Sequence, residues 1–176
     1  MNSPIRSSAL PTVEEVFRPI VGKWAWHVRR GFGSFLTMEF GEPRLEVRDP
    51  RDLAEDVSDQ VRRNFKKRRV TLVGEWHLWV QYCDWAILTP NSGVSNRETD
   101  AKKVDQCLEE LDGQALVAVD DNAARASCLL HFDLGATLEL SPSLDSDDND
   151  LWTVHHLHNT VFGYRSNGTV VSEPAD

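Results

Sequence analysis

The sequence is short of the features that mark a disulfide-rich, metal-thiolate or membrane protein. It has three cysteines in 176 residues, Cys83, Cys107 and Cys128, and no CxxC pair. An odd number at wide spacing indicates neither a disulfide framework nor a thiolate metal site. The N-terminal residues lack the apolar core of a signal peptide. No run approaches the roughly 18 apolar residues of a transmembrane helix. We therefore expect a cytoplasmic protein.

The common catalytic signatures are missing as well. No GxSxG, HExxH or DxDx(T/V) phosphatase pattern occurs. The glycines of Gly31-Phe32-Gly33 precede a predicted strand, whereas a phosphate-cradling glycine turn opens a helix. The acidic run 145–150 resembles a calcium loop but lacks the glycine at its sixth position, and His156 stands where a bidentate Glu is needed. The sequence thus predicts no catalytic residue and no cofactor.

The charge is unbalanced toward acid, with 28 Asp and Glu against 19 Lys and Arg, a net −9. General affinity for nucleic-acid phosphates requires a basic surplus, and an anionic membrane would also repel the chain. Nucleic acid and membrane are therefore not expected partners. The charge fits a protein that binds basic surfaces, or one kept soluble by self-repulsion.

What the chain does have is period-two patterning, which predicts antiparallel strands. Trp24, Trp26 and Val28 fall on one face of the first strand. The run Glu75–Trp85 holds three of the six tryptophans and predicts one long strand from about Val70 to Leu88, covered on both faces. Further strands are expected at residues 34–40, 45–47, 115–119, 126–134, 136–140, 151–158 and 161–164, with a short tail strand.

Two capping-box spacings predict helices. Thr12 and Glu15 open a short helix, and Ser95 with Glu98 precedes a second helix that Gly113 ends. We expect an α+β fold with two or three helices and a mostly antiparallel, curled or barrel-like sheet of eight or nine strands. Residues 1–11 would be a loose leader, and residues 12–176 a single domain.

Residues 50–69 interrupt this pattern as a charged helical insertion. Its apolar stripe repeats every four residues, its first half is acidic, and its second half carries the basic run 62–69. This order complements the helix dipole, so the charges have a structural explanation. The alternative is that the cationic end contacts a partner. The asymmetry between this run and the acidic residues 145–150 could also drive self-association, so a homodimer is possible.

The histidines raise the question of a metal site. His156 and His158 would share one face of a strand, and an alternating pair of this kind can bind zinc. A third ligand is also needed, and the spacing does not choose among His27, His77, His131 and Asp133. The simpler interpretation is a set of surface histidines.

Two segments resemble a family of small uncharacterised bacterial proteins. They are Gly33-Ser34-Phe35-Leu36-Thr37-Met38-Glu39-Phe40-Gly41 and Gly74-Glu75-Trp76-His77-Leu78-Trp79, followed by Cys83-Asp84-Trp85. The resemblance covers residues 23–165, with a variable insertion between the two strands. It brings no activity and no catalytic residues. Small acidic, Trp-rich bacterial proteins of this kind are often immunity or accessory proteins of toxin and phage-defence systems, which is an association only.

Three functions follow, in decreasing order of preference. The first is a non-enzymatic module that binds another protein through an acidic patch and an exposed aromatic anchor, formed by Asp145, Asp147, Asp148, Asp150 and Trp152. The second is a small-molecule pocket formed by Trp24, Trp26, Glu75, Trp76, His77 and Trp79. The third is a metal-dependent hydrolase that uses His156, His158 and another histidine.

Overall fold

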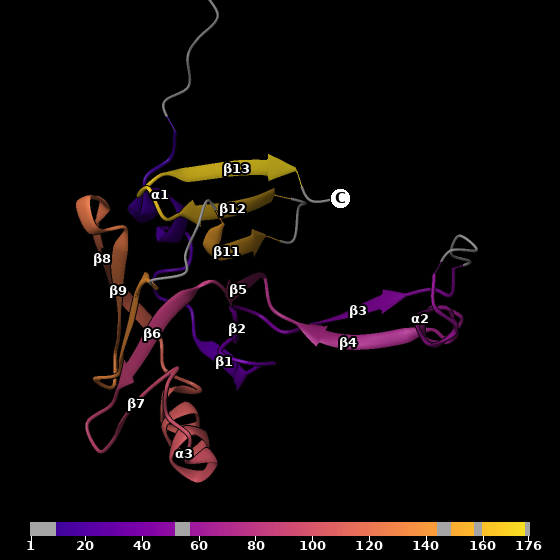
Figure 1. The fold of residues 1–176 in the computed structure, drawn as a ribbon, viewed down its shortest axis with the longest axis horizontal. Coiled ribbons are helices and arrows are strands. Elements are labelled where there is room, and N and C mark those ends of the chain that lie inside the picture. The colour runs from indigo at the N-terminus through magenta and orange to yellow at the C-terminus, as the bar shows by residue number, and fades with distance from the viewer. Residues whose placement is uncertain (1–9, 52–56, 144–148, 157–159, 175–176) are drawn as a thin grey trace, which may run out of the picture.

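The computed structural model describes residues 10–51, 57–143, 149–156 and 160–174. In this part of the chain it shows an α+β protein with three α-helices, and its strands pair antiparallel. The strands form a six-stranded sheet, a five-stranded sheet and a separate two-stranded ribbon (Figure 1). Neither large sheet closes on itself, so the expectation of a barrel-like sheet is wrong. The thirteen described strands also exceed the eight or nine expected.

The six-stranded sheet runs in the order β1, β2, β5, β11, β12, β13. Its inner face buries one aliphatic row, in which Met38, Leu78 and Val154 stand opposite one another on neighbouring strands. The strand bounds are β1 (Ala25–Arg30), β2 (Leu36–Phe40), β5 (Trp76–Val80), β11 (Asp150–His156), β12 (Thr160–Arg165) and β13 (Val170–Pro174).

The five-stranded sheet runs in the order β7, β6, β10, β9, β8. It offers a matching row of Ile87, Leu138 and Leu130, and both rows belong to one hydrophobic core. Burying both rows in a shared core removes them from water, which is the main force that holds the two sheets together. The bounds are β6 (Cys83–Leu88), β7 (Gly93–Ser95), β8 (Leu116–Asn122), β9 (Ser127–Phe132) and β10 (Thr137–Pro142), with a short 3-10 turn at Ala123–Arg125.

Helices complete the core. The predicted capping box opens α1 (Val13–Phe17): Glu15 N–H donates to Thr12 Oγ1, and Thr12 N–H donates to Glu15 Oε2. Helix α3 (Ala101–Leu111) contacts β1, β6 and β7, and Asp100 caps it. The expected Ser95–Glu98 cap is wrong, because Ser95 is the last residue of β7. No helix among the described residues is long and apolar enough to cross a membrane.

Trp152 lies in the core and not on the surface. Its indole is 0% exposed and stacks on the Tyr164 ring, with the ring centroids 5.0 Å apart. Tyr164 in turn donates a hydrogen bond of 3.1 Å to Asp121 Oδ1 on β8, which ties the two sheets together. The expectation that Trp152 is an exposed anchor is therefore wrong, because the inner face of β11 needs a large apolar side chain at this position.

The long strand predicted at residues 70–88 is three strands in three different sheets. They are β4 (Arg69–Val73), β5 and β6, and the chain turns at Gly74 and again after Val80. Only one face of β5 is buried, since Trp79 on the other face is 36% exposed. Near the start of β1, His27 adopts a left-handed φ of 52°, and a bulge shifts the register there. Ala25 and Val28 are consequently the buried residues, and the expected shared face of Trp24, Trp26 and Val28 does not form.

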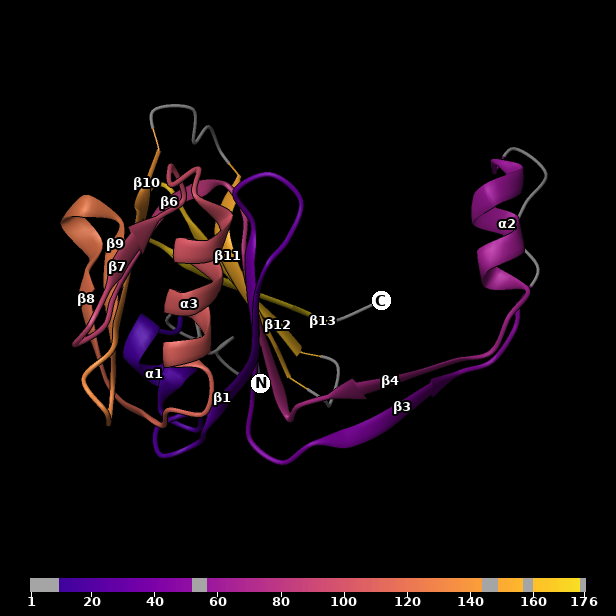
Figure 2. The ribbon, with the colours of Figure 1, turned by 90° about the horizontal axis from the view of Figure 1, so that it is seen from below.

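An arm (residues 44–73) extends away from the two-sheet body. It consists of β3 (Arg44–Arg48) paired with β4, and α2 (Asp59–Phe65) lies at its far end (Figure 2). Of the helical insertion expected at residues 50–69, the described part contains the short helix α2 at the tip of a longer excursion, and residues 52–56 lie outside the described residues. At the tip, Arg51 lies over the Phe65 ring, 4.7 Å from its centroid.

Candidate functional site

A polar row crosses the outer face of the six-stranded sheet. Glu39 on β2 stands opposite His77 on β5, which stands opposite His155 on β11. The row follows from the alternation, because neighbours of each residue along its strand (Met38, Leu78, Val154) face the core. Three polar groups that are separated by 38 and 78 residues in sequence therefore become adjacent.

Glu39 and His77 form the centre of the site. Glu39 Oε1 lies 2.9 Å from His77 Nδ1, and Glu39 Oε2 accepts the Gly74 N–H at 3.0 Å. Burial by itself raises the pKa of Glu39, but the hydrogen bond from His77, attraction to its ring and the Gly74 N–H outweigh it, so the pKa lies below its ordinary value of 4.5. An ionised Glu39 can only accept hydrogen bonds, so the proton of neutral His77 is on Nδ1. Nε2 of His77 then carries no proton and can accept a hydrogen bond.

His155 adds a second imidazole. Its ring centroid is 6.0 Å from that of His77, and its Nε2 lies 3.1 Å from Thr153 Oγ1. Burial, together with repulsion from His77, lowers the pKa of His155 below its ordinary value of 6.5, and Glu39 offsets part of the shift. His155 is therefore neutral at pH 7 and takes up a proton only in more acidic solution.

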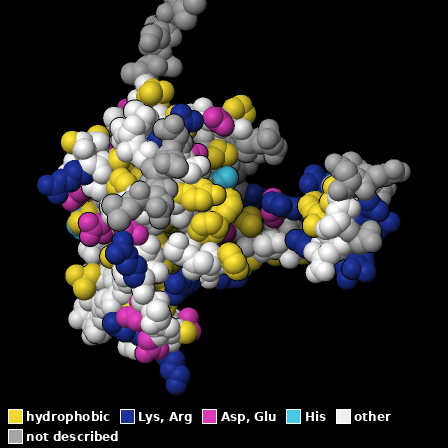
Figure 3. Space-filling view, viewed as in Figure 1, with side chains coloured by type: hydrophobic (Ala, Val, Ile, Leu, Met, Phe, Trp, Pro, Cys, Tyr) yellow, Lys and Arg dark blue, Asp and Glu magenta, His cyan; other side chains and the backbone are white. Residues whose placement is uncertain are grey.

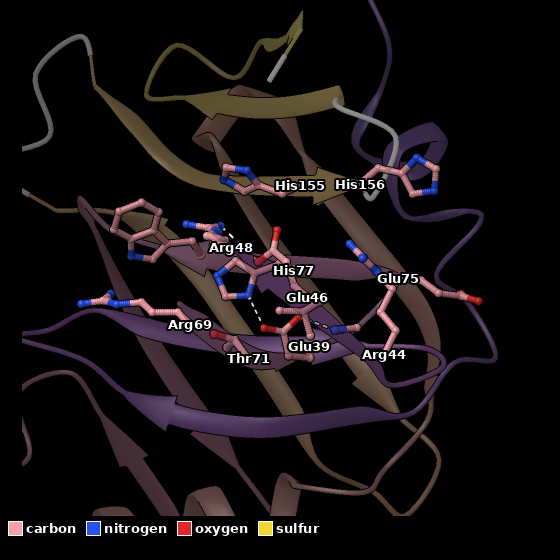
Figure 4. A pocket seen from close by; sticks show the side chains of 13 residues that line it. Glu39, Arg44, Glu46, Arg48, Arg69, Thr71, Glu75, His77, His155 and His156 are labelled. Carbon is pink, nitrogen blue, oxygen red and sulfur yellow. Dashed lines mark hydrogen bonds and ion pairs between the residues drawn. The ribbon is translucent and has the colours of Figure 1, made fainter. Parts of the chain in front are cut away.

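The polar face of the arm forms the other wall of a cleft of about 520 Å³. Arg44, Glu46 and Arg48 alternate along β3, and Arg69 stands opposite Arg48 on β4. Figure 4 shows these side chains and the Glu39–His77–His155 row around the same space. Arg48 pairs with Glu46 at 3.2 Å. Among the described residues, no carboxylate forms an ion pair with Arg44 or Arg69.

The structure brings together three of the six residues predicted to form a small-molecule pocket. Glu75, His77 and Trp79 line the cleft, and the Glu75 carboxylate binds Lys23. Trp76 packs on the inner face of β5 and stacks on His156 at the cleft rim, with centroids 4.1 Å apart. Most of the residues that line the cleft are charged or polar.

The other two tryptophans lie elsewhere. Trp24 is 62% exposed beside Ala115, and Trp26 Nε1 donates to the Gly41 carbonyl at 2.9 Å. Neither side chain lines the cleft.

The predicted metal ligands do not gather in the described part of the chain. No three His, Cys, Asp or Glu side chains there are grouped so that they could hold a metal ion. His156 stacks on Trp76, His131 binds Asp120, and Asp133 accepts the Ala115 N–H. His158 lies outside the described residues.

The predicted acidic patch lies largely outside the described residues too, since Asp145, Asp147 and Asp148 are not among them. Asp150 is described, and its carboxylate lies 3.5 Å from Arg165 Nε. With Trp152 in the core, the described residues provide no apolar anchor at this place.

Sequence reasoning missed Glu39, His155 and the arginines of the arm. Alternation alone could have placed Glu39 on the outer face of its strand and Arg44, Glu46 and Arg48 on one face of theirs. What the alternation does not contain is the pairing of β2 with β5 and of β5 with β11, which assembles the row.

Comparison of the chain with known protein families, with curated proteins and with solved structures found no match in any of the three. The functional argument therefore rests on the geometry of the cleft and the arm.

Proposed function

We propose that the protein binds a small molecule that carries an oxyanion, a phosphate or a carboxylate, in the cleft between β5 and the arm. The observation that carries this proposal is the Glu39–His77–His155 row facing Arg44 and Arg69, two arginines without a carboxylate partner in the described chain. The guanidinium fork matches the geometry of a carboxylate or phosphate and binds it in bidentate fashion. The cleft volume of about 520 Å³ lies within the range of small-molecule sites.

The acidic groups of the cleft do not oppose an anion, because each already has a partner. Glu39 is held by His77 and Gly74, Glu46 by Arg48, and Glu75 by Lys23. Glu39 also fixes the orientation of the His77 ring, so Nε2 meets the ligand in a set position. Protonation of His155 at low pH would add positive charge, so we expect anion affinity to rise as the pH falls below 6.5.

Isothermal titration calorimetry with inorganic phosphate, pyrophosphate and succinate tests this function. Arg69→Gln removes an arginine of the cleft and should weaken binding about tenfold or more, the effect of losing one charge-assisted hydrogen bond. Arg68→Gln is the matched control, because Arg68 pairs with Asp49 and does not line the cleft. Failure of all three anions to bind, or equal losses in both variants, would contradict the proposal.

Protein binding is a second candidate function, and the arm favours it. The face of the arm that points away from the cleft carries exposed aliphatic side chains, as protein interaction sites do. The sequence predicted the contact with another protein at residues 145–152. The exposed aliphatic side chains favour residues 44–73 for this contact instead.

A further inference from the structure

The arm has two chemically different faces. In the register of the ribbon, Leu45 stands opposite Leu72 and Val47 opposite Val70, on the face away from Arg44, Glu46 and Arg48. These four aliphatic side chains are between 41% (Leu72) and 66% (Leu45) exposed. They form one continuous apolar face, which we call the aliphatic face.

A two-stranded ribbon with an exposed aliphatic face is incomplete by itself. A single hairpin is marginally stable in water, because it has nothing against which to bury its apolar side chains. The polar face of the arm borders the cleft, but the aliphatic face remains open in the described part of the chain. A partner that covers this face would remove its side chains from water and stabilise the ribbon.

The charge distribution indicates which partner. The arm holds nine of the 19 basic and six of the 28 acidic residues, so it carries +3 while the rest of the chain carries −12. Figure 3 shows Lys and Arg side chains gathered around α2 at the far end of the arm. The basic tip is thus complementary to the body of the same protein, which it does not contact within one copy (Figure 2).

We propose that the aliphatic face is covered by the arm of a second copy of this chain, in an antiparallel pair around a two-fold axis. The aliphatic face consists of two cross-strand pairs, Leu45 with Leu72 and Val47 with Val70, so it can pack against a second copy of itself. The interface of a two-fold dimer must be self-complementary in this way. The antiparallel direction carries each basic tip over the acidic body of the other copy. A parallel direction would instead place two basic tips side by side.

This dimer goes beyond ligand binding in the cleft and does not depend on it. The dimer holds the arm in a fixed position. It therefore also positions Arg44 and Arg69, which line the cleft together with His77. The two proposals remain separable, because association is measured without any ligand.

The first experiment measures the mass of the full chain by size-exclusion chromatography with light scattering, in dilute and concentrated protein. We expect wild type to approach twice 19.9 kDa when concentrated. Leu45→Glu and Leu72→Glu should remain monomers, because a carboxylate on the aliphatic face would be buried without a partner. Both side chains are exposed in a single copy, so the fold should survive, as circular dichroism would verify.

Leu134→Glu is the matched control. Leu134 is 68% exposed in the turn between β9 and β10, away from the arm, so this variant should dimerise like wild type. Wild type that stays at 19.9 kDa at every concentration would overturn the proposal and leave the face to a different protein. Dimers of undiminished stability in Leu45→Glu and Leu72→Glu would overturn it too.

The second experiment decides the direction of the two arms. The double variant Lys66→Glu with Lys67→Glu reverses charge at the tip. In the antiparallel pair these residues face an acidic body, so the variant should dissociate at least tenfold more readily, and added salt should weaken the wild-type dimer. Tighter association of the variant would show that the tips repel each other, and would overturn the antiparallel arrangement.

Discussion

His77 Nδ1 lies 2.9 Å from Glu39 Oε1, and the two residues stand directly opposite one another on adjacent strands. The hydrogen bond sets the tautomer and the orientation of the His77 ring, while the Gly74 N–H holds the other carboxylate oxygen. Both oxygens of a nearly buried carboxylate are thus hydrogen-bonded, and the histidine that it orients lines the cleft. The Glu39–His77 hydrogen bond therefore contributes to the stability of the sheet and also orients a side chain of the site.

Replacing Glu39 by Gln should destabilise the fold by about 1.5–3 kcal/mol at pH 7, the usual effect of losing hydrogen bonds to a buried charge. Because the pKa of folded Glu39 is lowered, its contribution is present above pH 4.5 and is lost as the pH falls through the folded pKa. The two proteins should therefore converge in strongly acidic solution. Urea unfolding measures the difference. Glu139→Gln, at an exposed position of β10, should leave stability nearly unchanged.

Gly74→Ala should destabilise the fold by about 1–3 kcal/mol, because the added methyl group meets backbone that cannot move away. A Cβ at this position would lie 2.6 Å from the Phe40 carbonyl oxygen and 3.0 Å from its nitrogen. Thermal unfolding is the measurement. Gly93→Ala is the comparison, since its new methyl group crowds only the end of the exposed Leu88 side chain, at 3.2 Å, and lies at an ordinary contact distance of 3.7 Å from the Ile87 carbonyl oxygen. Equal stability of the two variants would contradict this account of the point where the arm joins the sheet.

The ring of His155 should titrate below pH 6.5 in nuclear magnetic resonance spectra. As the pH falls, the unfolded chain takes up this proton before the folded protein does. The free energy of unfolding is therefore highest above pH 6.5 and decreases as the pH falls from 6.5 through the lower pKa of folded His155. His155→Gln should therefore reduce the slope of unfolding free energy against pH between 7 and 5.5. His131→Gln, on the other sheet, serves for comparison. A midpoint at or above 6.5 would show that the His155 ring is solvated and does not lie against His77.

All three cysteine thiols should be unreactive toward Ellman's reagent in the native protein and fully reactive after denaturation. Cys83, Cys107 and Cys128 are buried, and burial raises the pKa of each thiol, to about 12 for Cys83. The thiolate is the attacking species, so both its access and its concentration are low. An added surface cysteine, Leu134→Cys, should react at once. Rapid reaction of a native thiol in wild type would show that the core opens locally.

Local patterns predicted a large part of the fold. The alternation of apolar residues indicated antiparallel strands, Thr12 and Glu15 marked the start of α1, and Gly113, with φ of 91°, follows the end of α3 as expected. These features depend on residues within a few positions of one another. The same alternation put Glu75, His77 and Trp79 on one face of a strand, because side chains two residues apart point to the same side, and in the structure all three line the cleft.

Long-range pairing decided the rest. The run Val70–Leu88 is continuous in hydrophobicity, yet its parts enter three sheets, because backbone hydrogen bonds are satisfied with partners far along the chain. The left-handed residue His27 reverses which residues of β1 are buried, and the inner face of β11 takes Trp152 from the expected surface into the core.

The sequence by itself determined the α+β class, the antiparallel strands and which residues of a regular strand share a face, because these follow from the geometry of neighbouring residues. Only the tertiary structure decided that Glu39, His77 and His155 form one row, that the arginines of the arm line the same cleft, and that Leu45, Val47, Val70 and Leu72 share an open face. Register between strands is set by the packing of the whole core, and no local pattern contains it.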